Sequence, residues 1–353
     1  MRVLVIGPSF VKSKGGMATV IEEIAKDKEL KSKFNIDIDV YESYVDGSRL
    51  KVLFFSVFSF IRFYFTKRNY DIYHIHAASY GSTFRKGWYV RAVKKWGKKV
   101  ILHIHGAEYM IFYKKSKRKK KILSILEEAD KVIALSADWK NKFDQTFGIK
   151  NCVILENGID TERLKSAISA PDLHPHVFLA LGRLGTRKGT YDLIEAIEHV
   201  KKQIPDIKCY LAGDGEIEKC KSLISHKKLQ DNILVVGWVD FERKIELLKK
   251  SSVLVLPSYN EGLPMAILEG MASGKAIIST KVGAIPEVVK SENGILIEPG
   301  NVNALEVALK KFCLDKGALE AIGKANINLV NEKYSMRAMH QKLAEIYYDV
   351  IGE

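Results

Sequence analysis

The sequence lacks the features of a membrane-spanning or exported protein. Its 353 residues contain no run of about 18 uncharged apolar residues, so no membrane-spanning helix is predicted. The first residues offer only Val3 to Ile6 before Gly7 and polar sequence, which is too short for the apolar region of a signal peptide. We therefore expect a protein that stays in the cytoplasm.

Cysteine is scarce as well. The four cysteines lie far apart and form no C-x-x-C pair: Cys152, Cys209, Cys220 and Cys313. Disulfide frameworks and zinc sites need closer spacing, so we interpret these residues as buried thiols in a reducing compartment. We assign them no chemistry.

Positive charge is abundant but uneven. The net charge is +14, and residues 1–170 hold 32 Lys and Arg against 18 Asp and Glu, which leaves 24 of each sign in the rest. The whole excess therefore lies in the first half. Such a half could meet nucleic acid, an anionic membrane or a phosphorylated substrate, and charge alone does not choose among these partners.

Apolar runs alternate with helical patterns through the first half. Residues 1–7 form a continuous apolar run ending in glycine, as in a central parallel strand, and residues 17–25 space their apolar positions as a helix does. Further strands are predicted at residues 36–40, 71–76, 100–105, 131–135 and 152–155. The alternation predicts an α/β fold with a doubly wound parallel sheet.

The same alternation restarts after the proline-containing segment 171–175, which we predict to be a linker. Strands are predicted at residues 177–181, 208–212, 233–236, 253–257, 276–280 and 294–297, with helices such as 191–204 between them. We therefore expect two Rossmann-like domains, residues 1–170 and 171–334, and a final helix within 335–353 that returns to the first domain. Ligands of such sheets bind beyond the carboxyl ends of the strands, so the site is expected in the cleft between the domains.

The strongest chemical feature is the segment Glu-Gly-Leu-Pro-Met-Ala-Ile-Leu-Glu from Glu261 to Glu269, which follows a predicted strand. A carboxylate in the loop and another in the next helix can point to one site, and the helix start offers backbone N–H groups to an anion. Taken alone, the segment is equally a helix with an exposed glutamate at each end.

Cations also stand after a strand earlier in the same half. Gly182-Arg183-Leu184 and Lys188-Gly189 lie between a predicted strand and a helix, and arginine and lysine suit phosphate oxygens. A solvated helix start is the alternative. Three further turns follow strands: Gly213-Asp214-Gly215, Gly237-Trp238-Val239 and Gly283-Ala284-Ile285-Pro286-Glu287.

In this order the motifs resemble the donor domain of the family 4 retaining glycosyltransferases (glycosyl transferases group 1), which have the two-domain GT-B fold. The resemblance covers most of residues 177–300 and reaches into the first half at Lys14-Gly15-Gly16-Met17, His103-Ile104-His105-Gly106, 134–136 and 156–160. It implies transfer of a sugar from a nucleotide-sugar donor to a glycan or lipid-linked acceptor. Many relatives build bacterial surface polysaccharides such as capsule, exopolysaccharide or lipopolysaccharide.

The resemblance also implies roles for individual residues. In the second half, Arg183 and Lys188 would hold the donor diphosphate, Glu269 the ribose and Glu261 the sugar hydroxyls. The backbone amides of Gly262, Leu263, Pro264 and Met265 would help to hold the sugar and phosphate.

The resemblance also implies roles for two positions of the first half. The loop at Gly15 and Gly16 would present an amide to the phosphate, and His105 would lie beside the transferred sugar. His103 lies two positions away on the same strand face, so a pair of buried, hydrogen-bonded histidines is the alternative.

No metal and no cofactor is expected. In a retaining transfer of this kind the leaving diphosphate can take the proton of the acceptor, while fixed cations and helix amides stabilise its charge. Asp37-Ile38-Asp39 has the Asp-x-Asp spelling of metal-dependent glycosyltransferases, but it alternates with Ile36, Ile38 and Val40. We interpret these aspartates as the polar face of a strand.

Two segments of the first half fall outside the resemblance. Residues 53–65 contain six phenylalanines, and residues 112–122 contain Lys114, Lys115, Lys117, Arg118, Lys119, Lys120 and Lys121. They could contact an anionic membrane and hold the protein on the inner face of the cell membrane. The alternatives are a buried helix for the first segment and a solvated basic helix for the second.

Three other functions are compatible with parts of the sequence. A nicotinamide dehydrogenase shares the paired Rossmann architecture, but Gly7-Pro8-Ser9-Phe10 follows the first strand and no G-x-G-x-x-G opens its helix. A nucleic-acid-binding protein would explain the basic half, yet no recognition motif is present. An inverting GT-B glycosyltransferase is the nearest rival, and it would lack the pair of glutamates.

Overall fold

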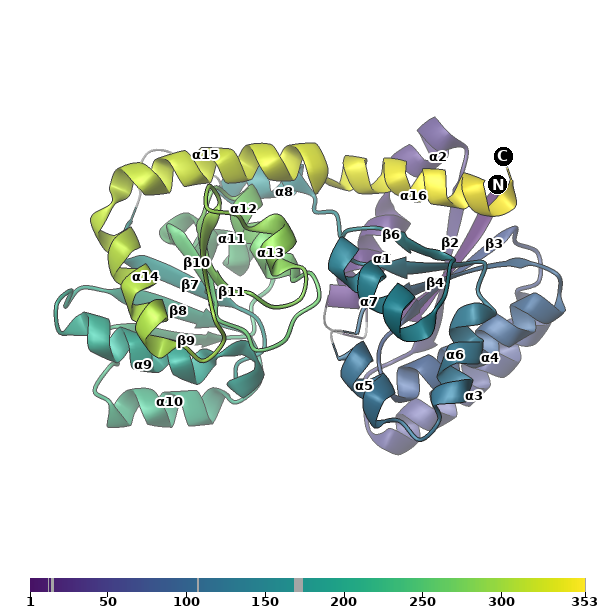
Figure 1. The fold of residues 1–353 in the computed structure, drawn as a ribbon, viewed down its shortest axis with the longest axis horizontal. Helices are drawn as coiled ribbons and strands as arrows, with labels where there is room; N and C mark the ends of the chain where they lie inside the picture. Colours follow the sequence, from purple (N-terminus) through teal and green to yellow (C-terminus); the bar gives the residue numbers. More distant parts are fainter. Residues whose placement is uncertain (12, 14–15, 107, 168–173, 353) are drawn as a thin grey trace. The chain divides into compact units, whose positions relative to one another are not determined.

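The chain forms two compact units. The computed structural model describes residues 1–11, 13, 16–106, 108–167 and 174–352. The first unit comprises Met1–Gly158 with Met336–Glu353, and the second comprises Ile159–Ser335. The first unit thus ends before the predicted boundary at residue 170, and most of the predicted linker 171–175 lies outside the described residues. Each unit holds one six-stranded sheet with helices, which confirms the predicted α/β class (Figure 1).

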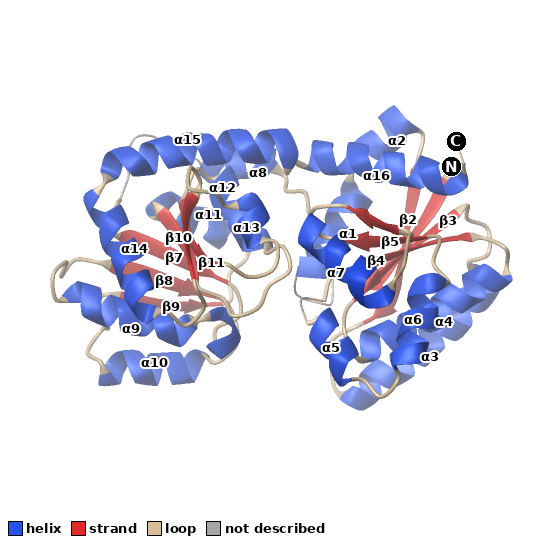
Figure 2. Ribbon diagram, viewed as in Figure 1, coloured by secondary structure: helices blue, strands red, loops and turns tan. Residues whose placement is uncertain are grey.

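The sheet of the first unit is parallel throughout, in the order β2-β1-β3-β4-β5-β6. Its strands are β1 (Arg2–Pro8), β2 (Asp37–Tyr44), β3 (Ile72–Ala77), β4 (Lys99–Ile104), β5 (Lys131–Ala134) and β6 (Cys152–Ile154). The central strands β1, β3 and β4 are almost wholly buried, because helices cover both faces of the sheet. That burial on both faces explains why these strands are nearly continuous apolar runs in the sequence (Figure 2).

The helices of the first unit cover two chemically different faces. They are α1 (Gly16–Lys26), α2 (Glu29–Phe34), α3 (Arg49–Thr66), α4 (Gly81–Lys95), α5 (Tyr109–Lys115), α6 (Lys119–Glu127), α7 (Ala137–Phe147) and α16 (Met336–Ile351). On one face, Phe63 of α3 packs against Tyr73 of β3. On the other, Tyr347 of α16 hydrogen-bonds the next residue of the same strand, His74. Successive strand residues point to opposite faces, so α3 and α16 lie on opposite sides of this sheet.

The second unit repeats the parallel design, in the order β12-β11-β10-β7-β8-β9. Its strands are β7 (Val177–Leu181), β8 (Lys208–Ala212), β9 (Ile233–Gly237), β10 (Val253–Leu256), β11 (Ala276–Thr280) and β12 (Gly294–Ile297). Its helices are α8 (Thr161–Leu164), α9 (Thr190–Lys201), α10 (Ile217–His226), α11 (Phe241–Lys250), α12 (Met265–Ala272), α13 (Ile285–Val288), α14 (Val302–Leu314) and α15 (Lys316–Lys333). The described part of this unit also holds two short 3₁₀ helices, η1 (Lys165–Ala167) and η2 (Thr186–Lys188).

The final helix returns to the first unit, as predicted. Lys342 of α16 forms an ion pair of 2.7 Å with Glu156, and Tyr348 hydrogen-bonds the carbonyl of Phe34. The chain therefore passes between the units twice, after Gly158 and after Ser335. No helix in the described ranges is both long and apolar enough to cross a membrane.

Candidate active site

The carboxyl edge of the second sheet brings a predicted lysine and a predicted glutamate into contact. Lys188 ends η2 after strand β7, and Glu261 lies in the loop after the neighbouring strand β10. The Lys188 ammonium donates to Glu261 Oε1 at 2.5 Å, and the two side chains are only 15% and 7% exposed. Two motifs 73 positions apart in sequence thus form one charged pair.

Glycine is required where these loops meet. Gly189 has φ of +66°, and a Cβ there would lie 2.0 Å from the carbonyl oxygen of Pro257. Gly283 has φ of +56°, and its Cβ would lie 2.1 Å from the carbonyl oxygen of Glu261. Both positions combine left-handed backbone with close approach to another main chain, which only glycine tolerates. The loops that carry Lys188 and Glu261 are therefore held by backbone packing.

Arginine supplies further charge at this edge. Arg187, which the sequence motifs did not single out, donates to the carbonyl of Asn260 at 3.0 Å and lies 3.8 Å from Glu261 Oε1. Arg183 instead pairs with Asp214 at 3.2 Å, and both of these side chains are more than half exposed. An exposed pair of this kind is weak, so the guanidinium is available to exchange its partner. A small pocket at the same edge is lined by Gly182, Leu184, Lys188, Thr190 and Pro257.

Glu269 has its own lysine partner. It lies on α12 and forms an ion pair with Lys244 of α11, and the two side chains are 15% and 22% exposed. Sequence reasoning missed Lys244, which stands 25 positions away on a helix without a recognisable motif. Each predicted glutamate is therefore compensated by one mostly buried lysine.

The loop before α12 holds the predicted backbone contacts. Gly262, Leu263 and Pro264 precede the helix, which begins at Met265. Pro264 is the N-cap and has no backbone N–H, so it cannot donate to an anion, and this corrects its predicted role as an amide donor. Its ring fixes the backbone at the helix start instead. The carbonyl of Gly262 accepts from the amide of Ala284 at 3.0 Å, which ties this loop to the Gly283 turn.

Two predicted features of the first unit lie at opposite ends of its strands. Gly16 is the exposed first residue of α1, after strand β1, whereas Gly15 lies outside the described residues. Asp37 and Asp39 stand at the start of β2, where Asp37 pairs with Lys31 and Asp39 accepts from Tyr70 at 2.7 Å. Both aspartates are about half exposed. The interpretation of Asp37 and Asp39 as a polar strand face is confirmed.

His105 belongs to a group of four imidazoles. It follows β4 directly, its amide donates to the carbonyl of Ala77, and its Nε2 lies 2.8 Å from Nδ1 of His76. His103 is buried, and its Nδ1 lies 3.2 Å from Nε2 of His74. Desolvation lowers the pKa of His74 and of His105 to about 3. The alternative of two buried, hydrogen-bonded histidines fits His103, whereas His105 is only partly buried. Each of them bonds a histidine of β3, His74 or His76, which carried no motif that could have revealed them.

A buried lysine also escaped the motif analysis. Lys86 of α4 is 3% exposed, and its ammonium donates to the hydroxyl of Ser43, which itself donates to the carbonyl of Gly7 at 2.8 Å. Burial lowers the pKa of Lys86 to about 7. It lies near the carboxyl ends of β1 and β2, the same sheet edge as His105.

Two family models match the chain and leave few residues uncovered. The model for glycosyl transferases group 1 matches residues 161–329, and the model for Glycosyltransferase Family 4 matches residues 19–163. The chain belongs to the group 1 and family 4 glycosyltransferases. This membership decides against the dehydrogenase and nucleic-acid-binding alternatives.

Curated relatives of this glycosyltransferase are about a quarter identical to it over the aligned residues. Glycogen synthase of Mycobacterium tuberculosis is 25% identical over 231 residues, which are 63% of this chain and 55% of that protein, so the chain spans about half of that relative. The UDP-Gal:alpha-D-GlcNAc-diphosphoundecaprenol alpha-1,3-galactosyltransferase of Escherichia coli is 28% identical over 81% of this chain and 77% of its own length. The amylovoran biosynthesis glycosyltransferase AmsK of Erwinia amylovora is 24% identical over 78% and 69%.

Solved structures support the fold. HepE of Anabaena in complex with UDP has a TM-score of 0.79 at 18% identity, covering 99% of this chain and all of the other. Sucrose-phosphate synthase of Thermosynechococcus elongatus has a TM-score of 0.80 at 20% identity, covering 99% of both chains. Identities this low establish the fold alone, which is the GT-B fold of this glycosyltransferase.

The backbone packing at Gly189 can be tested by substitution. We expect Gly189→Ala to lower the free energy of unfolding by more than about 3 kcal/mol, because a left-handed alanine costs roughly 1–2 kcal/mol and its Cβ would also clash with the carbonyl of Pro257. Gly148→Ala is the control: φ is again +66°, but nothing lies within 4 Å of a Cβ there. Urea unfolding of both variants measures the difference. Equal losses would show that Gly189 serves only as a left-handed residue.

Proposed function

We propose that this glycosyltransferase moves a sugar, with retention of anomeric configuration, from a nucleotide-sugar donor to a glycan or lipid-linked acceptor in bacterial surface-polysaccharide biosynthesis. The observation that carries the proposal is the contact of Lys188 with Glu261 at the carboxyl edge of the second sheet. It puts a cation suited to phosphate and a carboxylate suited to sugar hydroxyls one hydrogen bond apart. The activities for which the E. coli and E. amylovora relatives are named support the pathway and the lipid-linked acceptor.

The paired charges suggest how the donor enters. Lys188 and Arg183 would exchange their carboxylate partners for the donor diphosphate, and Glu261 and Glu269 would then accept from hydroxyls of the sugar and the ribose. Such an exchange gives the Lys188 ammonium a phosphate in place of its carboxylate and gives Glu261 hydroxyl donors in place of its lysine, so neither mostly buried group loses all its polar partners. Gly16 and His105 of the first unit carry the roles that the family resemblance implies for phosphate and sugar.

The proposed chemistry uses no metal. As the sugar leaves the nucleotide, negative charge grows on the leaving diphosphate, and Arg183, Lys188 and the first amides of α12 would stabilise it. The diphosphate in turn takes the proton of the acceptor hydroxyl on the same face of the sugar. That same-face attack is what retains the anomeric configuration.

The two glutamates are tested by charge removal. We expect Glu261→Gln and Glu269→Gln each to lower transfer by about 100-fold or more, the usual scale for loss of one preorganised polar contact in a transferase site. Glu195→Gln, on the exposed side of α9, is the matched control and should retain full activity. Product formation and melting temperature are measured together. Wild-type activity in both variants at unchanged melting temperature contradicts the assignment, and an inverted product anomer would identify the inverting alternative.

Metal independence is a separate expectation. Transfer should continue at the same rate in EDTA, because fixed side-chain cations replace a divalent ion at the diphosphate. Rates are compared with and without EDTA, and after addition of magnesium or manganese. Loss of activity in EDTA that either metal restores would overturn the metal-free mechanism.

The first unit carries an apolar stripe that suits a membrane surface. On α3 the exposed large apolar residues recur with helical spacing and are 40–72% exposed: Leu50, Leu53, Phe54, Val57, Phe58, Ile61 and Phe65. Only the opposite side of the helix is packed, through Phe60 and Phe63. The alternative of a buried helix therefore fails for half of its surface. Contiguous exposed apolar area of this kind marks an interaction surface.

Basic residues lie in the same helical layer. α3 and α6 both pack against α4, and Arg118 and Lys121 lie over the ring of Phe84 on α4. The seven cations from Lys114 to Lys121 are all exposed, and in the described part of the chain no carboxylate pairs with them. An apolar stripe beside uncompensated positive charge complements an anionic lipid surface. We therefore place the enzyme, in this proposal, on the inner face of the cell membrane.

Liposome sedimentation tests the membrane proposal. Wild type should bind anionic vesicles, because each basic residue near the surface contributes about 1 kcal/mol, and binding should weaken with salt because the Debye length is only about 10 Å at 0.1 M. Changing Lys117, Arg118, Lys119 and Lys120 to Ser should abolish the salt-sensitive part. Changing Phe54, Phe58 and Phe65 to Ser should abolish the salt-resistant part.

The control for charge alone lies in the second unit. Changing the exposed Lys311, Lys316, Lys324 and Lys333 to Ser removes the same net charge and should leave binding intact. The basic run is merely a solvated surface if wild type does not bind anionic vesicles at low salt. The same conclusion follows if the two four-residue charge variants lose binding equally.

A further inference from the structure

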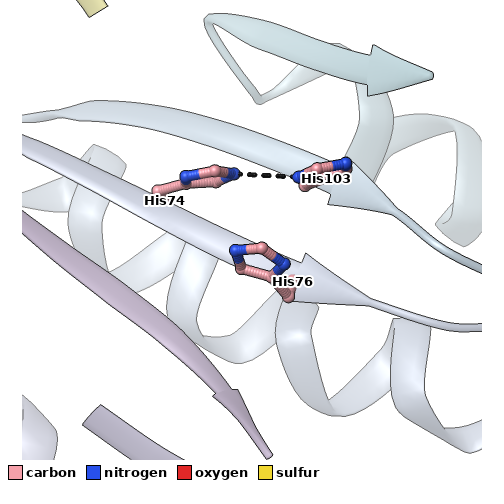
Figure 3. A group of neighbouring side chains, drawn as sticks. All are labelled: His74, His76 and His103. Carbon is pink, nitrogen blue, oxygen red and sulfur yellow. Dashed lines mark hydrogen bonds between the residues drawn. The ribbon is translucent and has the colours of Figure 1, made fainter. Parts of the chain in front are cut away.

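A polar network runs through the covered face of the first sheet. His74 and His76 of β3 lie beside His103 and His105 at the end of β4, all on the face that α16 covers. Figure 3 shows His74, His76 and His103, with the hydrogen bond of 3.2 Å between His74 Nε2 and His103 Nδ1. The network continues from His74 Nδ1 to the hydroxyl of Tyr347 at 2.7 Å. A separate bond of 2.8 Å joins His76 Nδ1 to His105 Nε2.

These imidazoles are neutral at physiological pH. Desolvation lowers the pKa of His74 and His105 to about 3 and holds the pKa of His76 and His103 far below the ordinary value. Each ring therefore carries one N–H and one lone pair. In each hydrogen bond between two rings, one nitrogen must donate and the other must accept.

Two unpaired nitrogens decide which ring donates. His76 Nε2 and His103 Nε2 are buried and have no hydrogen-bond partner among the described residues. A buried N–H without an acceptor is rarer than a buried acceptor without a donor. The protons of His76 and His103 are therefore assigned to Nδ1, which leaves only lone pairs unsatisfied.

The assignment passes from ring to ring. With its proton on Nδ1, His76 donates to His105 Nε2, so His105 must carry its own proton on Nδ1. In the same way the Nδ1–H of His103 donates to Nε2 of His74, and the Nδ1–H of His74 donates to the hydroxyl oxygen of Tyr347. All four rings then share one tautomer. The alternative tautomer would bury two unpaired N–H groups.

We propose that His76 is a positioning residue that fixes His105 as the Nδ1–H tautomer, so that His105 offers the substrate a hydrogen-bond donor and cannot act as a general base. The proposal rests on the proposed function, which assigns His105 to the transferred sugar. The lone pair of His105 is occupied by the His76 N–H, and the free polar atom is an N–H that suits a hydroxyl or phosphate oxygen. The proton of the acceptor hydroxyl must then go elsewhere, in agreement with transfer to the leaving diphosphate.

A metal centre is the rival interpretation of the same residues. His74, His76 and His103 each offer a nitrogen within 4.8 Å of the others, and imidazole suits zinc. Both nitrogens of His74 already form hydrogen bonds, Nε2 with His103 Nδ1 and Nδ1 with Tyr347, so zinc would have to break one of them to bind all three rings. The hydrogen-bonded arrangement therefore favours a tautomer network over a metal site.

Nitrogen-15 NMR of the histidine-labelled full chain tests the proposal without a substrate. We expect the buried rings of His74, His76 and His103 and the partly buried ring of His105 to show the Nδ1–H pattern and to remain neutral from about pH 5 to pH 8. His105→Asn identifies the signals of His105. An Nε2–H tautomer for His105 in the wild type overturns the proposal, as does stoichiometric zinc that survives purification and is lost in His103→Gln.

Variants at position 76 separate positioning from packing. The amide nitrogen of asparagine lies near the place of Nδ1, so His76→Asn should keep His105 in the Nδ1–H form. His76→Leu removes the donor and should return His105 to a mixture that contains the Nε2–H form. An unchanged His105 spectrum in His76→Leu overturns the positioning role, and if that variant does not fold, the wild-type spectrum still decides. If the Glu261→Gln assay contradicts the proposed function, the tautomer of His105 measured by NMR is unaffected. Failure of the proposed function can therefore be distinguished from failure of the tautomer proposal.

Discussion

The parallel direction of the strands is the constraint on which the rest of the molecule depends. In both sheets of the described chain each strand pairs in parallel with its neighbours, so all carboxyl ends meet at one edge of each sheet. The loops after β7, β10 and β11 are therefore stacked side by side, which brings Lys188, Glu261 and Gly283 together. In the first unit the same rule brings His105 next to residues of β3.

Charge compensation shapes the edge of the second sheet. Glu261 and Glu269 are largely desolvated, and a carboxylate in that state needs a cation close by. Lys188 and Lys244 supply it, and the exposed pair of Arg183 with Asp214 lies at the same edge. A site that is neutralised internally can accept an anionic diphosphate by exchange of partners. The side-chain cations already supply the positive charge that a metal ion would otherwise bring to the diphosphate. For this reason we favour a metal-free transfer.

The two faces of the first sheet differ in chemistry. The face under α3 and α4 is filled with aromatic rings such as Phe63 and Tyr89. On its other side, α3 exposes a second set of apolar side chains to solvent. The face under α16 holds four imidazoles, and those of His74 and His103 form a hydrogen-bonded chain that ends at Tyr347. The final helix therefore supplies a hydrogen-bond partner to the interior of the first sheet. In our proposal, membrane contact and substrate contact therefore lie on different sides of one sheet.

The sequence by itself determined the strands, the α/β class and the family, because strands buried on both faces must be apolar runs and because Glu261, Glu269 and Lys188 stand in recognisable order. It did not reveal Lys244 as the partner of Glu269, nor His76 as the partner of His105, since these contacts depend on which helix face and which strand register come together. The exposure of the α3 stripe was hidden for a similar reason. A segment apolar on all sides has no polar face to show which side packs, so only the tertiary structure decided that Phe63 is buried and Phe58 is not.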